Sequence, residues 1–107
     1  MRTENMTSNK GRAVPNQFII SDSYTRKDGA LVDREVFQSY KSVIAQIEIV
    51  NASHVNIDPE VKISLDSTYW NYSVTTSKYR NQFLNETKKE TQKKIDSGEY
   101  TLTDLNQ

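Results

Sequence analysis

The stretch from Tyr69 to Asn85 constrains the fold of this chain more than any other, because it concentrates the aromatic side chains. It holds the only tryptophan, three of the six tyrosines and one of the three phenylalanines of the 107 residues. Each aromatic side chain buries a large area, so a cluster of them in a short chain must lie where strands and helices meet. We therefore expect this stretch to join a sheet to the helices that cover it.

Upstream of this stretch, apolar and polar side chains alternate as they do in β-strands. In residues 43–50, Gln46 and Glu48 share one face. The opposite face carries Val43, Ala45, Ile47 and Ile49. Similar runs at residues 17–21, 35–40 and 61–65 predict three further strands.

Two turns connect the predicted strands. Gly29 follows a charged tripeptide and can take a positive φ, so residues 23–33 are expected to form a hairpin loop or a surface excursion. Only Lys41 and Ser42 separate the next two runs, which predicts a tight antiparallel turn. Residues 1–14 are polar without a periodic apolar face, so we expect a mobile arm there and a single domain over residues 15–107.

After Asp66 the pattern changes to helical spacing. Tyr79 and Phe83 are four residues apart and share a face, while Thr75 or Thr76 can cap the start of their helix. Asn85 can end that helix in the left-handed conformation.

A second helix is predicted by the capping-box spacing of Thr87 and Glu90, and Gly98 stops it after Ser97. Residues 99–105 then form a short strand or a docked tail. The chain is thus predicted to be α+β, with an antiparallel β-sheet meander of three to five strands packed on one face by two short C-terminal helices.

Charge and composition limit the function classes. The chain carries 14 basic and 14 acidic side chains, which argues against strong nonspecific DNA binding, whereas six basic and three acidic groups in residues 75–98 keep local binding open. Cysteine is absent, and no apolar run is long enough to span a membrane. We expect a cytoplasmic protein that makes no membrane contact.

No residue pattern points to catalysis. His54 is the only histidine and stands in a polar loop, so a surface histidine is favoured over the general base of a small hydrolase. The acidic pairs Asp58 with Glu60 and Asp28 with Asp33 are expected to be solvated turn residues rather than metal ligands. The sequence therefore predicts no enzyme, no metal and no cofactor.

Seven residues around the two helices are candidate contacts for a partner. They are Tyr72 as an aromatic anchor, Lys78, Arg80 and Asn81 on the first helix, and Lys88, Lys89 and Lys93 on the second. Guanidinium and amide groups beside an aromatic ring suit an RNA or phosphate contact. On the second helix, Glu86 and Glu90 interleave with the lysines, which favours ordinary surface ion pairs.

Three segments carry a resemblance to a family of small uncharacterised proteins encoded by phages and plasmids of bacteria. They are residues 37–45, 69–84 and 94–100, and the resemblance extends from Gly11 to Asn106. Lys41 departs from the asparagine expected in the hairpin turn, and residues 21–34 and 51–60 look like insertions. The resemblance implies an accessory gene of a mobile element whose product acts in the cytosol of a bacterial host, and such genes often encode inhibitors of host defence, anti-CRISPR proteins among them.

Two functions follow as expectations. The first is a non-enzymatic accessory protein that binds a host protein or ribonucleoprotein stoichiometrically and inhibits a defence system such as a CRISPR-Cas nuclease. The alternative is a nucleic-acid-binding accessory or regulatory protein that uses the basic C-terminal helices. The sequence sets no oligomeric state for either.

Overall fold

The computed structural model of the chain describes residues 1–51 and 59–107, which form six strands and two helices. The strands are β1 (Arg2–Thr7), β2 (Ala13–Thr25), β3 (Leu31–Ser39), β4 (Ser42–Asn51), β5 (Glu60–Asp66) and β6 (Thr101–Thr103). The helices are α1 (Val74–Leu84) and α2 (Lys88–Asp96). The strands lie in one sheet in chain order, antiparallel from β1 to β5, and β6 is parallel to β5. The predicted α+β class and meander are confirmed.

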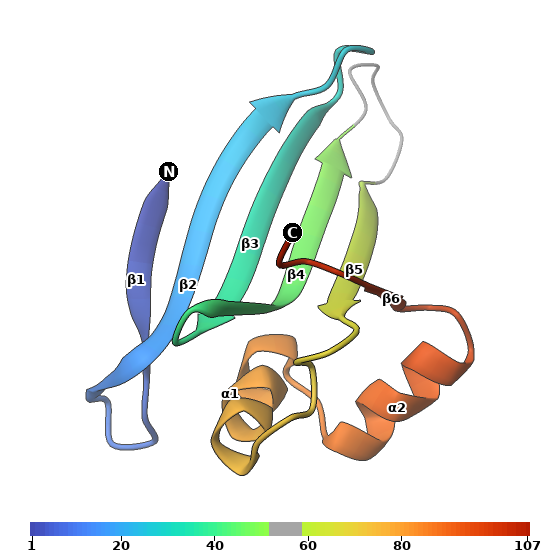
Figure 1. Ribbon diagram of the computed structural model, residues 1–107. Helices are drawn as coiled ribbons and strands as arrows, with labels where there is room; N and C mark the ends of the chain where they lie inside the picture. Colours follow the sequence, from blue (N-terminus) through green and yellow to red (C-terminus); the bar gives the residue numbers. More distant parts are fainter. Residues whose placement is uncertain (52–58) are drawn as a thin grey trace.

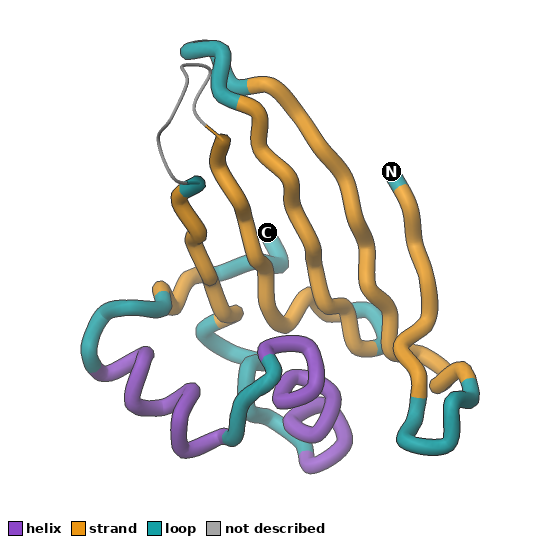
Figure 2. The backbone as a smooth tube through the Cα atoms, turned by 180° about the vertical axis from the view of Figure 1, so that it is seen from behind, coloured by secondary structure: helices purple, strands orange, loops and turns teal. Residues whose placement is uncertain are grey.

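Both helices lie at one end of the sheet, as Figures 1 and 2 show from opposite sides. Helix α1 contacts β3 and β4 near the hairpin that joins them, while the other ends of β2 and β3 extend beyond the helices. The aromatic stretch begins directly after β5 and leads into α1. It therefore forms the expected junction between sheet and helices.

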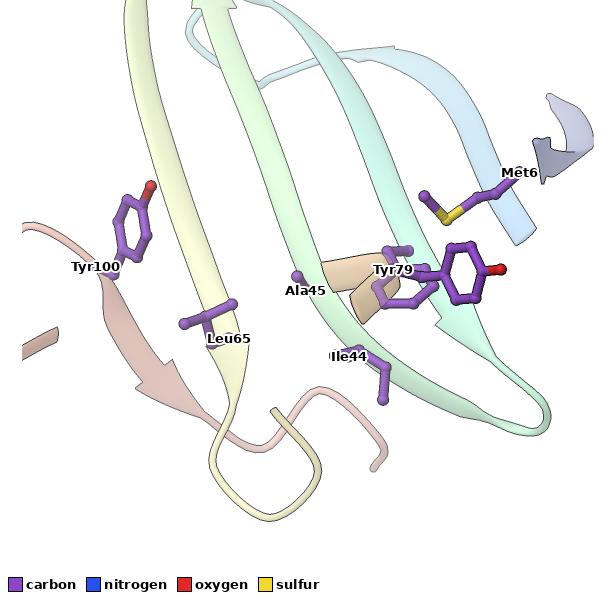
Figure 3. Packing of buried hydrophobic residues seen from close by; sticks show 7 residues of the cluster. Met6, Ile44, Ala45, Leu65, Tyr79 and Tyr100 are labelled. Carbon is purple, nitrogen blue, oxygen red and sulfur yellow. The ribbon is translucent and has the colours of Figure 1, made fainter. Parts of the chain in front are cut away.

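The hydrophobic core lies between α1 and the sheet (Figure 3). Its buried members are Met6, Phe37, Ile44, Ala45, Leu65, Tyr79 and Tyr100, and Trp70 and Phe83 pack against them. The rings of Phe37 and Phe83 lie 5.8 Å apart, which joins α1 to β3. Tyr79 and Phe83 therefore share the buried face of α1, as their spacing predicts.

A β-bulge in β4 corrects the predicted alternation of that strand. Phe37 pairs with Ala45 and Gln38 with Val43, which leaves Ile44 as the extra residue. Both Ile44 and Ala45 are fully buried, whereas Val43 is only half-buried. The bulge thus moves Ile44 into the core position that simple alternation assigns to Val43.

The N-terminal segment is not the expected mobile arm, because Arg2–Thr7 forms edge strand β1. Met6 reaches the core with 3% of its surface exposed, and the Asn5 side chain donates a hydrogen bond to the Val14 carbonyl at 2.9 Å. Pairing with β2 satisfies backbone groups and needs no periodic apolar face. A sequence pattern based on side chains therefore misses this strand.

The hairpins refine the predicted turns. Gly29 takes φ +88° between β2 and β3, as expected. Residues 21–34 belong to this long hairpin, where Arg34 and Asp22 form an ion pair at 2.5 Å. The β3–β4 turn consists of Tyr40 and Lys41 rather than Lys41 and Ser42, and Tyr40 takes the left-handed conformation with φ 56°.

Helix boundaries agree with the sequence except at one cap. Ser73 caps α1 in place of Thr75 or Thr76, since its side chain accepts a hydrogen bond from the Thr76 N–H at 3.1 Å. Asn85 ends α1 in the left-handed conformation, and the capping box of Thr87 and Glu90 opens α2 as predicted.

Residues 52–58 lie outside the described part of the chain. His54 and Asp58, singled out in the sequence, therefore have no structural description. Neither of the two helices in the described residues, α1 and α2, is long and apolar enough to cross a lipid bilayer.

Candidate binding groove along helix α1

An open groove of about 900 Å³ runs along the outer face of α1. It is lined by Asn9, Asn71, Tyr72, Ser73, Val74, Ser77, Lys78, Asn81, Gln82 and Lys88, and we call it the α1 groove. The α1 residues in this set recur three and four positions apart, which places them on one face of the helix. From Val74 to Gln82 this face is about 12 Å long.

Three elements wall the α1 groove. Helix α1 turns its aromatic face to the sheet, so its polar face is left for the groove. Asn9 belongs to the turn between β1 and β2, and Gln82 holds this side by donating a hydrogen bond to the Thr7 carbonyl at 2.9 Å. Lys88 is the first residue of α2. The groove therefore depends on both helices and on the β1 hairpin that sequence reasoning missed.

Tyr72 stands at the amino end of the α1 groove as a fixed aromatic surface. Half of its surface is exposed, while its ring and that of the half-buried Tyr69 form a T-shaped contact with 5.3 Å between ring centroids. Tyr69 in turn packs against the core. The Tyr72 ring is thus exposed to a partner and held by the protein.

Arg80 is not a surface contact, which corrects the expectation from the sequence. Arg80 is fully buried, and its guanidinium lies 5.1 Å from the centroid of the Trp70 ring. The Nη1 atom donates to the Trp70 carbonyl at 2.6 Å. Burial lowers the pKa of Arg80 below its ordinary value, and Glu86 partly offsets this by its negative charge. A helical pattern places charged residues outward, whereas here stacking and hydrogen bonds hold the charge inside.

Two asparagines connect the buried arginine to the α1 groove. The Arg80 Nη2 atom donates to Asn81 Oδ1 at 2.8 Å, and Nη1 lies 3.4 Å from Asn71 Oδ1. Ser77 also donates to Asn71 Oδ1 at 2.9 Å. Because a guanidinium has donors only, each asparagine must turn its oxygen inward to it. The Nδ2 groups of Asn71 and Asn81 are consequently the amide atoms that do not bind Arg80, and both residues line the groove.

The lining of the α1 groove is positively charged. Lys78 and Lys88 lie in it, and none of its lining residues is an aspartate or a glutamate. The amino end of α1 adds the partial positive charge of the helix dipole, and the first turn of that helix contains no acidic residue. Such a surface attracts anions.

A buried carboxylate in the turn after α1 holds α2, and with it Lys88, to that turn. Glu86 accepts hydrogen bonds from Thr91 Oγ1 at 2.5 Å, Tyr100 Oη at 2.5 Å and Lys94 Nζ at 3.0 Å. Only 4% of its side chain is exposed. Burial raises the pKa of Glu86, but these three hydrogen bonds outweigh that effect, so its pKa lies below the ordinary value of 4.5. Burial, together with the Glu86 carboxylate, raises the pKa of Tyr100 to about 12.

The structure brings four of the seven predicted contact residues together. Tyr72, Lys78, Asn81 and Lys88 line the α1 groove, and Arg80 lies behind its wall. Lys89 and Lys93 are exposed on α2 but do not line the groove. Sequence reasoning missed Asn9, Asn71, Ser73, Val74 and Ser77 as lining residues. Helical spacing from Lys78 points to Val74 and Gln82, whereas only the fold places Asn9.

No group of three or more His, Cys, Asp or Glu side chains in the described residues is arranged to hold a metal ion.

A family of unknown function, DUF8033, matches residues 1–99, so the chain belongs to this family. No curated protein and no solved structure shows significant similarity to it.

Proposed function

For this member of the DUF8033 family, we propose a non-enzymatic role as an accessory protein of a phage or plasmid that binds a host macromolecule stoichiometrically. The contact surface in this proposal is the α1 groove. The partner in this proposal is a host protein or ribonucleoprotein, namely a defence complex such as a CRISPR-Cas nuclease. The resemblance in residues 37–45, 69–84 and 94–100 supports the mobile-element origin.

One observation carries the choice of surface. The α1 groove combines an exposed aromatic ring with amide and ammonium side chains over a volume of about 900 Å³. Tyrosine is among the residues that most often anchor binding interfaces, and Tyr72 is the exposed aromatic ring of this groove. Part of the groove is also fixed by hydrogen bonds, since Gln82 binds the Thr7 carbonyl and Glu86 binds Lys94 of α2, so these parts of its lining are held in place.

A titration of nuclease activity tests the stoichiometric mechanism. A fixed amount of defence nuclease is mixed with increasing amounts of the protein, and target cleavage is measured. A binding inhibitor reduces cleavage in proportion to its concentration and abolishes it near equivalence. Substoichiometric loss of cleavage that grows with time would instead indicate catalysis and contradict this proposal.

Variants then test the contact surface. Tyr72→Ala combined with Lys78→Glu should abolish inhibition, because both side chains lie in the α1 groove. The matched control is Lys89→Glu combined with Lys93→Glu, which changes exposed lysines of α2 outside the groove and should leave inhibition intact. Equal loss in both pairs would place the contact elsewhere.

The second candidate is a nucleic-acid-binding accessory or regulatory protein. The specific observation in its favour is that the groove lining contains Lys78 and Lys88 but no aspartate or glutamate. Binding to nucleic acid weakens steeply with salt because counterions are released. A salt titration against free RNA and DNA separates the two candidates, since an inhibitor that contacts only protein shows no such binding.

A further inference from the structure

The α1 groove presents hydrogen-bond donors where its wall meets buried Arg80. Asn71 and Asn81 engage the guanidinium through Oδ1, and within the described residues neither Nδ2 group has a hydrogen-bond partner of its own. Because the guanidinium can only donate, it binds Oδ1 of each asparagine and leaves Nδ2 available to a ligand. Lys78 and Lys88 add ammonium donors on the same surface.

This pattern selects an anion with several acceptor oxygens. Ammonium groups, outward amide N–H groups and a helix amino end are the groups that contact phosphate in proteins. Arg80 contributes a further positive charge behind the wall; none of its side-chain hydrogen bonds goes to a carboxylate. A phosphate group entering the groove would therefore meet attraction from the lining and from the layer beneath it.

Tyr72 narrows the choice of anion. Its half-exposed ring is held by Tyr69 and lies at the same groove as the donors. A planar base stacks on such a ring, whereas the aspartate and glutamate side chains that supply the charge of an acidic peptide carry no aromatic face. The base must be unpaired to reach the ring, so a duplex fits less well than a single strand.

We propose that the α1 groove binds single-stranded nucleic acid, with a base stacked on Tyr72 and phosphates contacted by Lys78, Lys88 and the outward amides of Asn71 and Asn81. This inference rests on the proposed function, in that single-stranded nucleic acid is the ligand of the second candidate and a component of a ribonucleoprotein partner in the first. Arg80 is a positioning residue in it and touches no ligand.

Fluorescence anisotropy with labelled oligonucleotides of matched sequence tests the ligand class. Single-stranded RNA, single-stranded DNA and the duplex are titrated with the full chain between about 50 mM and about 200 mM salt. Binding to either single strand, weaker binding to the duplex and loss of affinity with salt are expected, and the two single-stranded arms identify the sugar. No binding to either single strand at the lowest salt, or equal binding to the duplex, would overturn the proposal.

Asn81→Asp separates binding from stability. The carboxylate still accepts from Arg80, and now pairs with its charge, so the melting temperature should stay unchanged or rise. The outward donor is lost and a negative charge enters the α1 groove, so single-strand affinity should fall at least tenfold. A purely structural role for Asn81 predicts unchanged single-strand affinity. That result would refute the claim that Asn81 donates a hydrogen bond to the ligand.

Lysine variants provide the matched controls. Lys78→Gln should lower affinity and reduce the slope of log affinity against log salt by about 0.7, the value for one phosphate contact on a single strand. Lys89→Gln and Lys93→Gln, outside the groove, should leave affinity and slope unchanged. Equal effects from all three lysines would indicate diffuse attraction and contradict a built site.

Failure of this inference is distinguishable from failure of the proposed function. The inhibition assay is carried out with the wild-type protein and with the double variant Tyr72→Ala, Lys78→Glu. If the double variant no longer inhibits the nuclease while the wild type binds no oligonucleotide, the groove contacts protein. That result overturns the inference of a nucleic-acid ligand and leaves the proposed function standing. If inhibition is unaffected in the double variant, the assigned surface itself is wrong.

Discussion

Glu86→Ala should destabilise the protein strongly, because this carboxylate is a shared acceptor for groups from α2 and the segment that follows it. Thr91 and Tyr100 donate to it at 2.5 Å, and both residues are buried. A hydrogen bond to a charged group contributes about 1.5 kcal/mol at the lower end of the measured range, which gives about 3 kcal/mol for the two. Lys94 adds little, since more than a third of its side chain is exposed. For a chain of this length the melting temperature should fall by about 12 °C.

Urea and thermal unfolding followed by circular dichroism measure this change. Glu99→Ala is the control, because Glu99 also faces Lys94, at 3.9 Å, but is exposed, so its loss should cost less than about 0.5 kcal/mol. A loss below about 1 kcal/mol for Glu86→Ala would refute the reasoning.

The same variant has a signature in its pH dependence. The pKa of Glu86 is below 4.5 in the folded protein, so the unfolded chain takes up its proton first as the pH falls. The contribution of Glu86 is therefore fully present above pH 4.5 and is lost as the pH falls through its lower folded pKa. The stability difference between wild type and Glu86→Ala should shrink over that range, and a constant difference would contradict the assigned charge.

Three further predictions concern single positions. Asp66→Ala should cost about 3 kcal/mol in urea unfolding, because buried Asp66 accepts from the backbone N–H groups of Thr68, Tyr69 and Leu105, and each lost acceptor costs about 1 kcal/mol. Tyr40→Asn should raise stability by about 1 kcal/mol, since exposed Tyr40 holds φ 56° and asparagine tolerates that conformation better; a loss of stability would show that the ring contributes contacts. Val74→Asp should add about 0.5 kcal/mol at the amino end of α1 and weaken single-strand binding, and stronger binding would contradict the charge assigned to the groove.

The parts of the fold that sequence predicts are those set by local chemistry. Thr87 and Glu90 meet in a capping box because their spacing alone brings side chain and backbone together. Asn85 and Gly29 take positive φ because few other residues do so readily. The alternation in residues 61–65 likewise sets which side of β5 faces the core.

The parts that sequence misses depend on partners far along the chain. Strand β1 forms because its backbone pairs with β2, and only Met6 among its side chains is buried. The bulge at Ile44 is a matter of register between two strands, which no single run of residues encodes.

The candidate site follows the same division. Lys78, Asn81 and Lys88 are recognisable as polar helix residues, and Tyr72 as an aromatic outside the helix. Arg80 looks equivalent to Lys78 in a helical pattern, yet it turns inward because Trp70 offers both a ring and a carbonyl oxygen. That inward turn is what orients Asn71 and Asn81, so the chemistry of the groove becomes visible only in three dimensions.

Nuclear magnetic resonance of the side-chain amides tests the central claim most directly. The claim is that the Nδ2 groups of Asn71 and Asn81 face the α1 groove and contact single-stranded nucleic acid. Asn5 and Asn106 are internal controls, since their Nδ2 groups donate to the carbonyls of Val14 and Val43. On titration with a single-stranded oligonucleotide, the amide resonances of Asn71 and Asn81 should shift while those of Asn5 and Asn106 stay in place. Unmoved resonances for Asn71 and Asn81 at saturating oligonucleotide would contradict the account.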